Sequence, residues 1–247
     1  MDRMLYVAMN GAKQTLQAQA AHAHNLANAS TTGFRADLLD LRALPVYGAG
    51  HPSRVYVLAE RPAVDLRPGA ILHTGRDLDV AVEGEGYIAV LAPDGTEAYT
   101  RAGDLRLGPG GRLETGAGLP VLGNSGPIAL PPADKLEIAP DGTVSLRPRG
   151  QDAASLAVVD RIKLVRPDPG GLVKGADGLL RPAQPGAVLP ADARVRLAPG
   201  SLEASNVNAV EAMIQMVSLA RQFETQVKLM QSARDTDRAA SEMMRIS

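Results

Sequence analysis

Apolar residues recur in a heptad pattern at both ends of this chain of 247 residues. Steps of four and three place such residues along one side of an α-helix, and a stripe that narrow needs a partner helix. The N-terminal stripe, in which one residue is polar, consists of Leu5, Met9, Ala12, Leu16, Gln19, Ala23 and Leu26. The C-terminal stripe is wholly apolar and consists of Ala209, Met213, Met216, Ala220, Phe223, Val227 and Met230. The two stripes can pair with each other or with copies of themselves, so we expect the chain to assemble.

The middle of the chain is typical of short strands joined by turns. It holds most of the 25 glycines and 18 prolines, and the core must be aliphatic because the chain has no Trp and only 2 Phe. Short strands are predicted at residues 79–82, 87–91 and 161–164. Three dipeptides favour hairpins, namely Asp94-Gly95, Asp141-Gly142 and Asp177-Gly178. These signals predict an antiparallel sandwich or an irregular barrel.

The predicted fold class is therefore α+β, with a helix at each end of a β-rich domain. Residues 3–29 are rich in Ala, Gln and Leu and predict one helix. Residues 207–245 predict the other, which Asn208 caps, with Glu211 in its first turn. The predicted segments are 1–33 for the N-terminal helix, 34–76 for an extended connector, 77–198 for the β-rich domain and 199–247 for the C-terminal helix. The connector has one strand-like stretch at 54–58.

Composition excludes several classes of function. The formal net charge is −1 and no basic face is visible, so we expect no nucleic acid partner. The absence of cysteine removes disulfides, thiolate catalysis and Cys-type zinc sites. No apolar run reaches the ~18 residues of a membrane span. The first residues do not resemble a cleaved secretion signal, which favours the cytoplasm or export by a route that needs none.

The candidate catalytic and ligand-binding residues are few. Four acidic residues near the first strands could act as an acid–base pair of the kind found in glycoside hydrolases, but we expect them to be solvated. They are Asp77, Asp79, Glu83 and Glu85. Four histidines show no metal-binding pattern, namely His22, His24, His51 and His73. The glycine-rich run at 108–111 predicts a turn and not a phosphate loop. We therefore expect no catalytic residue, no cofactor and no metal.

Three separated motifs resemble bacterial flagellar rod and hook proteins. Residues 25–35 are similar to the signature that closes the N-terminal helix in that family, except that His24 stands where the family usually has Asn. Residues 205–213 are similar to the signature that begins its C-terminal helix, and residues 78–87 and 99–103 match its β-domain. The signature residues are Asn25, Leu26, Ala27, Asn28, Thr32, Gly33, Phe34, Ser205, Asn206, Val207 and Asn208. Within the family, residues 1–6 and 34–38 look most like the proximal-rod protein, with the distal-rod protein second.

The resemblance implies a structural role without catalysis. The terminal helices would pair as a discontinuous coiled-coil domain that lines a tubular rod, with the β-domain outside it. The implied partners are copies of this chain, other rod subunits and the flagellar type III export apparatus, and the implied location is the rod that crosses the periplasm. The expected assembly interface comprises Leu5, Met9, Leu16, Leu26, Met213, Met216, Ala220, Phe223, Val227 and Met230.

Three alternatives remain open from the sequence. The first is a distal-rod subunit of the same family. The second is a secreted carbohydrate-active enzyme, which would need carboxylates that converge in a cleft. The third is a free-standing coiled-coil oligomer that carries a β-domain.

Overall fold

The computed structural model describes residues 4–45, 55–148, 156–168, 170–184 and 186–246. The chain forms two compact units. Unit 1 comprises residues 1–29, 36–65 and 207–247, and unit 2 comprises residues 30–35 and 66–206. Residues 30–35 and 199–206 therefore lie in the β-rich unit 2, although most of them fall within the predicted helical segments. Helices and strands together confirm the α+β class.

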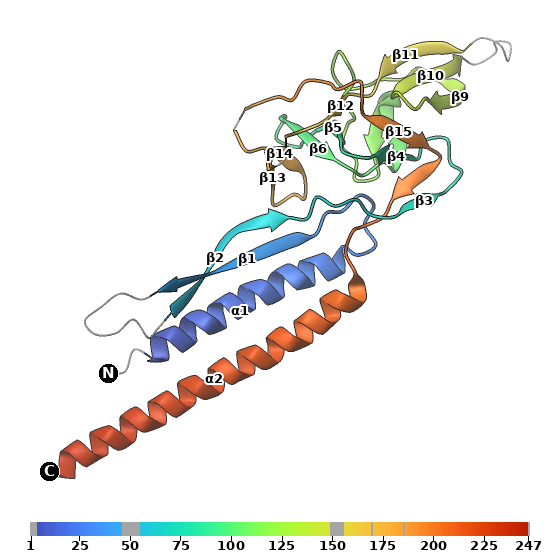
Figure 1. Ribbon diagram of the computed structural model, residues 1–247. Helices are drawn as coiled ribbons and strands as arrows, with labels where there is room; N and C mark the ends of the chain where they lie inside the picture. The colour runs from blue at the N-terminus through green and yellow to red at the C-terminus, as the bar shows by residue number, and fades with distance from the viewer. Residues whose placement is uncertain (1–3, 46–54, 149–155, 169, 185, 247) are drawn as a thin grey trace. The chain divides into compact units, whose positions relative to one another are not determined.

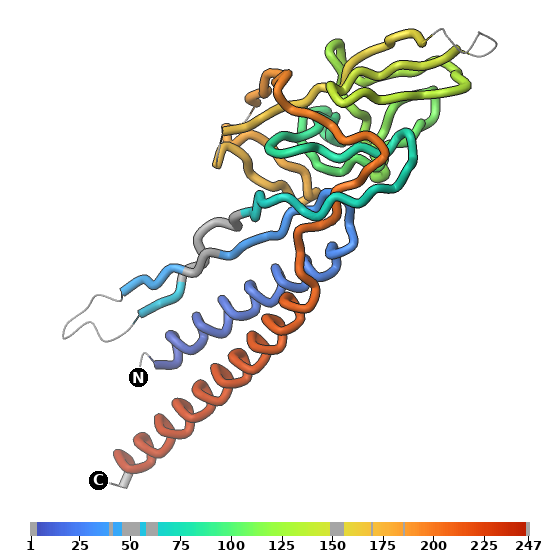
Figure 2. Tube along the Cα trace, turned by 45° about the vertical axis from the view of Figure 1, so that its right-hand side comes forward, coloured from blue at the N-terminus to red at the C-terminus, as the bar shows by residue number. Residues whose placement is uncertain are grey.

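Unit 1 contains two helices and one antiparallel strand pair. Helix α1 (Met4–Ala27) lies between helix α2 (Ala209–Ile246) and the pair formed by β1 (Asp37–Pro45) and β2 (Val55–Val64) (Figure 1). Helix α1 has 24 residues and α2 has 38. The C-terminal turns of α2 continue past the first turn of α1, as Figure 2 shows from a second direction.

The two helices end and begin where the polar residues of the sequence predict. The Nδ2 of Asn28 donates a hydrogen bond of 2.9 Å to the carbonyl of His24 and so satisfies one carbonyl of the last turn of α1. The Oδ1 of Asn208 accepts hydrogen bonds from the backbone N–H groups of Val210 and Glu211, at 3.1 and 3.2 Å. Asn208 is thus the N-cap of α2, as expected.

The segment predicted as an extended connector contains a strand pair. Strands β1 and β2 pair from Asp37 opposite Val64 to Pro45 opposite Val55, with a register shift between Leu38 and Asp40. The strand-like stretch at 54–58 was the only part of this pair that the periodicity indicated. The pairing was missed because the sequence between the two strands contains no hairpin dipeptide and prolines interrupt the pattern.

Unit 2 is built from short antiparallel strands. Its largest sheet has the order β12-β5-β6-β14-β13, a second has the order β11-β10-β9, and three two-stranded pairs complete it, namely β15-β4, β16-β3 and β7-β8. The strands are β3 (Ile71–His73), β4 (Val80–Glu83), β5 (Tyr87–Leu91), β6 (Glu97–Thr100), β7 (Leu105–Leu107), β8 (Leu113–Thr115), β9 (Ala133–Ile138), β10 (Thr143–Pro148), β11 (Ala157–Arg161), β12 (Leu164–Val165), β13 (Leu172–Lys174), β14 (Leu180–Pro182), β15 (Arg196–Pro199) and β16 (Ser201–Glu203), with a 3-10 turn η1 (Pro109–Gly111) after β7.

The three predicted hairpins are confirmed. Asp94-Gly95, Asp141-Gly142 and Asp177-Gly178 turn the chain between β5 and β6, β9 and β10, and β13 and β14. The prediction of one strand at 161–164 is wrong, because β11 ends at Arg161 and β12 begins at Leu164. The alternation is nevertheless real: Ile162 and Leu164 are buried and Lys163 is half-buried.

The core of unit 2 is aliphatic, as the composition requires. Its fully buried members come from strands throughout the unit and include Val80, Ile88, Leu105, Leu113, Ile138, Leu146 and Leu197. Tyr99 is the one aromatic side chain among its largest fully buried residues, within the part of the chain that the structure describes. Its hydroxyl accepts a hydrogen bond of 2.8 Å from the Leu189 N–H and donates one of 3.0 Å to Glu97.

Candidate assembly interface and family signatures

The C-terminal stripe is mostly half-buried beside α1. Met216, Ala220, Phe223, Val227 and Met230 all have intermediate exposure. Met213, the remaining residue predicted for the interface on this helix, is 53% exposed. The C-terminal stripe therefore has a partner within unit 1 along most of its length, which is one of the two pairings that the heptads allowed.

The N-terminal stripe remains largely uncovered. Leu5, Met9 and Leu16 are 40%, 54% and 49% exposed, and Leu26 is half-buried. The residues that α1 buries are small or polar and are mostly offset from this stripe; they are Ala8, Ala12, Gln14, Thr15, Ala18 and Asn25. At Gly11 an added Cβ would lie 3.1 Å from the Gln226 side chain of α2, so the two helices are close there. Small side chains thus make part of the contact of α1, while Leu5, Met9 and Leu16 stay largely exposed.

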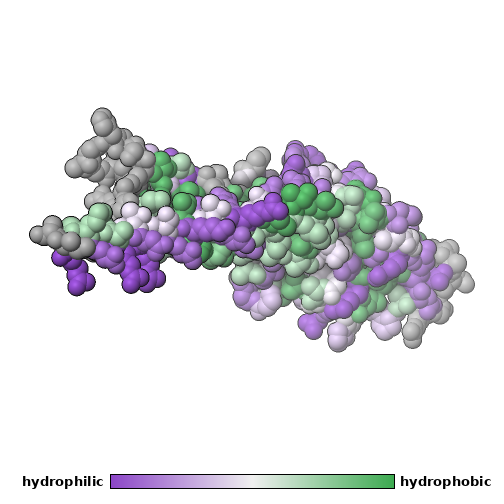
Figure 3. All heavy atoms as spheres, turned by 90° about the horizontal axis from the view of Figure 1, so that it is seen from below, coloured by the Kyte–Doolittle hydropathy of each residue, from purple (hydrophilic) through white to green (hydrophobic). Residues whose placement is uncertain are grey.

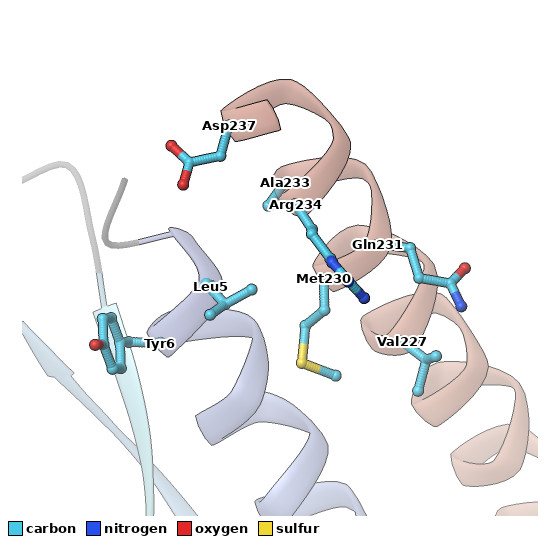
Figure 4. A pocket seen from close by; sticks show the side chains of 8 residues that line it. All are labelled: Leu5, Tyr6, Val227, Met230, Gln231, Ala233, Arg234 and Asp237. Carbon is cyan, nitrogen blue, oxygen red and sulfur yellow. The ribbon is translucent and has the colours of Figure 1, made fainter. Parts of the chain in front are cut away.

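A groove between the two helices contains residues of both stripes. Its volume is about 370 Å³. Leu5 of α1 and Met230 of α2 point toward each other across it (Figure 4). Val227 lies about one turn before Met230 on α2. Arg234 and Asp237 add charged groups at the end of the groove. The stripes therefore approach each other here without filling the space between the helices.

A second apolar row on α2 was missed by the heptad analysis. Val210, Ile214 and Val217 are 67%, 63% and 55% exposed. They follow steps of four and three like the C-terminal stripe, but they lie on another side of the helix. A row of hydrophilic side chains also runs along α2 (Figure 3). This row is short and ends at Arg221, so it does not form part of the longest heptad pattern in the helix.

The N-terminal signature residues fix the end of α1. The Asn25 side chain accepts a hydrogen bond from the Asp37 N–H and donates one to the Asp37 carbonyl, both 2.8 Å long. His24 Nδ1 lies 2.6 Å from Asp37 Oδ2. Leu26 is half-buried, while Ala27 is exposed. Asn25 therefore joins α1 to β1 through the backbone, independently of the side chain at 37.

The other signature residues lie where the chain enters and leaves unit 2. Phe34 is buried, and Lys174 Nζ lies 3.8 Å from the centre of its ring. The Asn206 N–H donates to the Phe34 carbonyl at 3.3 Å, and the Asn206 Nδ2 donates to the Arg67 carbonyl at 3.0 Å. The remaining signature residues have intermediate exposure, namely Thr32, Gly33, Ser205 and Val207.

A buried charged cluster lies beside these residues and was not predicted. The Glu203 cluster consists of Glu203, Arg35 and Arg101, whose side chains are 1–3% exposed. Arg35 Nη2 lies 2.6 Å from Glu203 Oε1, and Arg101 Nη1 lies 2.9 Å from Glu203 Oε2. Arg101 also donates to the carbonyls of Val82 and Gly84, at 3.2 and 2.6 Å. Both arginines belong to motifs noted in the sequence, but nothing local connects them with Glu203.

The acidic residues considered for catalysis have separate environments. The expectation that Asp79 is solvated is wrong, because it is 1% exposed and accepts a hydrogen bond of 2.6 Å from the Thr74 hydroxyl. Asp77 and Glu83 are exposed, and the exposed Glu85 pairs with Arg166. Burial of Asp79 was missed because a strand-end position does not reveal the loop that covers it.

Two further observations concern metal binding and membrane spans. No group of three or more His, Cys, Asp or Glu that could hold a metal ion occurs among the described residues. His51 lies outside those residues, so the expectation for it stays a prediction. No helix in the described part of the chain is long and apolar enough to span a membrane.

The chain matches three models of known protein families. Residues 5–35 match the family described as flagella basal body rod protein, residues 81–146 match the flagellar hook protein FlgE/F/G D1 domain, and residues 198–243 match the flagellar basal body rod FlgEFG protein C-terminal region. The chain is 45% identical over 252 aligned residues to the flagellar basal-body rod protein FlgF of Escherichia coli K12, with all of both chains covered. The chain belongs to the flagellar basal-body rod protein family.

Other relatives refine the position within the rod family. Identity is 44% to FlgF of Salmonella typhimurium, with all of both chains covered. Identity is 28% to the rod protein FlgG of Bacillus subtilis, over 93% of this chain and 94% of the relative. The chain is thus more similar to these FlgF proteins than to that FlgG protein. The family models cover both helices, so the two stripes and the signature residues lie within regions shared with rod proteins.

Proposed function

We propose that this chain is a structural subunit of the proximal flagellar rod and assembles with copies of itself and with other rod subunits. The observation that carries this proposal is the set of large apolar side chains left at the surface of α1 and α2. These are Leu5, Met9, Leu16, Val210, Met213, Ile214 and Val217, each 40–67% exposed. Apolar surface of this kind on two adjacent helices gains free energy when neighbouring helices cover it.

In the assembled rod, the two stripes would pack with those of neighbouring subunits as a discontinuous coiled coil. All of the residues predicted for the interface remain part of this proposal, and they differ in how exposed they are in the single chain. Met9, Leu16 and Met213 are exposed in the single chain, whereas Phe223 and Val227 are half-buried. The exposed members would make contacts between subunits, and the half-buried ones would hold α1 and α2 together. Torque would pass through many such contacts, each individually small.

The location and route follow from the same proposal. The subunit would leave the cell through the flagellar type III export apparatus and join the rod that crosses the periplasm. No catalytic step is part of this function. A secreted enzyme gains no support from the acidic residues, because Asp79 is bonded to Thr74 and Glu85 is paired with Arg166 at an exposed position. A distal-rod position has the weaker support, because identity to the FlgG relative is lower.

Substitution of the exposed apolar residues tests the proposal. Met9→Asp and Ile214→Asp each place a carboxylate where a neighbouring helix would exclude water. Burying an unpaired charge in this way costs several kcal/mol. We expect cells with either variant to lose motility, while the purified variants keep the circular dichroism and melting temperature of the parent. Lys228→Ala, at an exposed polar position of α2, is the matched control and should swim. Normal swimming by both Asp variants would refute the proposed interface.

A further inference from the structure

Glu203 lies at the place in unit 2 where the connections to unit 1 begin and end. The chain changes units after residues 29, 35, 65 and 206. The carbonyl of Glu203 accepts a hydrogen bond of 2.7 Å from the Gly33 N–H. Its side-chain Oε1 accepts one of 2.8 Å from the Gly69 N–H and lies 2.6 Å from Arg35 Nη2. Each of the three segments of unit 2 that lead to unit 1 therefore contains or contacts Glu203.

The backbone around Glu203 is closely packed and leaves no room for a side chain at Gly33 or Gly69. A Cβ added at Gly33 would lie 2.2 Å from the Arg101 carbonyl carbon, and one added at Gly69 would lie 2.0 Å from the Ala204 oxygen. The Ala204 N–H also donates to the Ala70 carbonyl at 2.8 Å. Segment 204–206 thus contacts 66–70 through Ala204, and it contacts 30–35 through the Asn206 N–H, which donates to the Phe34 carbonyl. The Glu203 carboxylate binds groups of both 30–35 and 66–70 beside these contacts.

The charges in the Glu203 cluster do not balance. Two guanidinium groups share one carboxylate, and all three side chains are almost fully buried. Nε and Nη1 of Arg35 and Nε of Arg101 have no hydrogen-bond partner among the described residues. A buried charge is costly unless a partner compensates it, so the two arginines depend on the single carboxylate. Removing the carboxylate should therefore increase the excess positive charge of the cluster, whereas removing one arginine should eliminate it.

We propose that Glu203 is a positioning residue that fixes segments 30–35, 66–70 and 204–206 in unit 2. Because the carboxylate follows almost all of unit 2 in the sequence while Arg35 precedes it, the cluster forms only when the two ends of the unit have met. The points at which α1 and α2 join the β-rich unit are therefore set in the same step that completes that unit. Glu203 lies within unit 2 and acts through the chain segments that lead to the two helices.

Hydrogen exchange measured by mass spectrometry on the full chain tests this role. In Glu203→Gln, we expect amide exchange in segments 30–35 and 66–70 to accelerate by about tenfold or more, because two buried guanidinium groups lose their countercharge. Exchange in β5 and β8 should stay close to that of the parent. Glu83→Gln, an exposed carboxamide substitution in the same unit, is the control and should change neither region. Unchanged exchange in the two segments, or acceleration spread evenly over unit 2, would overturn the proposal.

A second variant keeps the test decisive if Glu203→Gln is too unstable for exchange measurements and only its melting temperature can be determined. Arg35→Met removes one of the two guanidinium groups and its unpaired nitrogens, which leaves one arginine opposite one carboxylate. We expect it to melt at a higher temperature than Glu203→Gln, and we expect the Arg35→Met/Glu203→Gln double variant also to melt above Glu203→Gln alone. If Arg35→Met is as damaging as Glu203→Gln and the two effects add in the double variant, the carboxylate does not serve the arginines and the proposal fails.

Discussion

Asn25 and Asp37 are joined by two hydrogen bonds, both 2.8 Å long, in which the amide side chain of one pairs with the backbone N–H and carbonyl of the other. This pairing resembles the exchange of bonds between neighbouring strands, although one partner lies on a helix. Only an amide side chain can donate and accept in this way, since a carboxylate only accepts and a hydroxyl is too short. The geometry explains an asparagine at this position of the signature without reference to a partner subunit.

Asn25→Ala should destabilise unit 1. It leaves the N–H and carbonyl of Asp37 without this partner, and a buried backbone group that loses its partner costs about 1–3 kcal/mol. We expect a lower midpoint in urea unfolding followed by far-ultraviolet circular dichroism at the helical signal. Ala23→Ser, at an exposed position of the same helix, should lower the midpoint much less, because it costs only the difference in helix propensity of about 0.5 kcal/mol. An unaltered midpoint for Asn25→Ala would show that the two bonds contribute nothing net to stability.

Tyr99 should make unit 2 sensitive to alkali. Burial raises the pKa of Tyr99 from 10.0 to about 12, and the Glu97 carboxylate acts in the same direction. Because the pKa is higher in the folded state, this contribution to stability is fully present below pH 10 and is lost as the pH rises toward about 12. Melting temperatures measured from pH 8 to pH 12 should fall over that window.

The matched variant Tyr99→Phe separates this titration from general alkaline unfolding. It removes the acceptor of the Leu189 N–H, so at pH 8 its free energy of unfolding should be lower by about 1–3 kcal/mol. Its further decline between pH 10 and pH 12 should be shallower than that of the parent, since the group that ionises is gone. Parallel declines of the two proteins would assign the pH dependence to other residues.

Limited trypsin digestion should begin in the last turns of α2. Arg238 and Arg245 are exposed and belong to the C-terminal part of α2, whose last turns continue past α1. Helical turns without tertiary contacts open at little cost in free energy, whereas Arg35 and Arg101 are buried with Glu203. Mass spectrometry of early time points should find cleavage after residue 238 or 245 before any cleavage after residue 35 or 101. Early cleavage after Arg101 would contradict the order of local stabilities inferred here.

The elements with strong local signals could be predicted from the sequence. Both helices follow from apolar periodicity, and Asn208 caps α2 because its side chain reaches amides only two and three residues away. The Asp-Gly hairpins likewise depend on adjacent residues. In each case the group that stabilises the element lies within a few positions of the residue that indicates it. A short window of sequence therefore contains the whole interaction.

The features that were missed depend on partners far away in the sequence. Arg35 and Glu203 come from opposite ends of unit 2, and no periodicity or spacing connects them. The pairing of β1 with β2 joins residues that are distant in the sequence, such as Asp37 and Val64, and prolines interrupt the apolar pattern of the strands. The stripe on α1 was identified, but its neighbours could not be, since a heptad shows that a face is apolar without showing which surface covers it.

The unequal lengths of α1 and α2 have a consequence for symmetry. Because α2 has 38 residues and α1 has 24, the two ends of the helical pair differ. If the surplus turns of one copy bound a different surface of the next copy, the interface would be heterologous and all copies would point in the same direction. The outermost copy would then keep one binding surface unfilled. The surplus turns would in that way give a stack of copies a direction in which it can be extended.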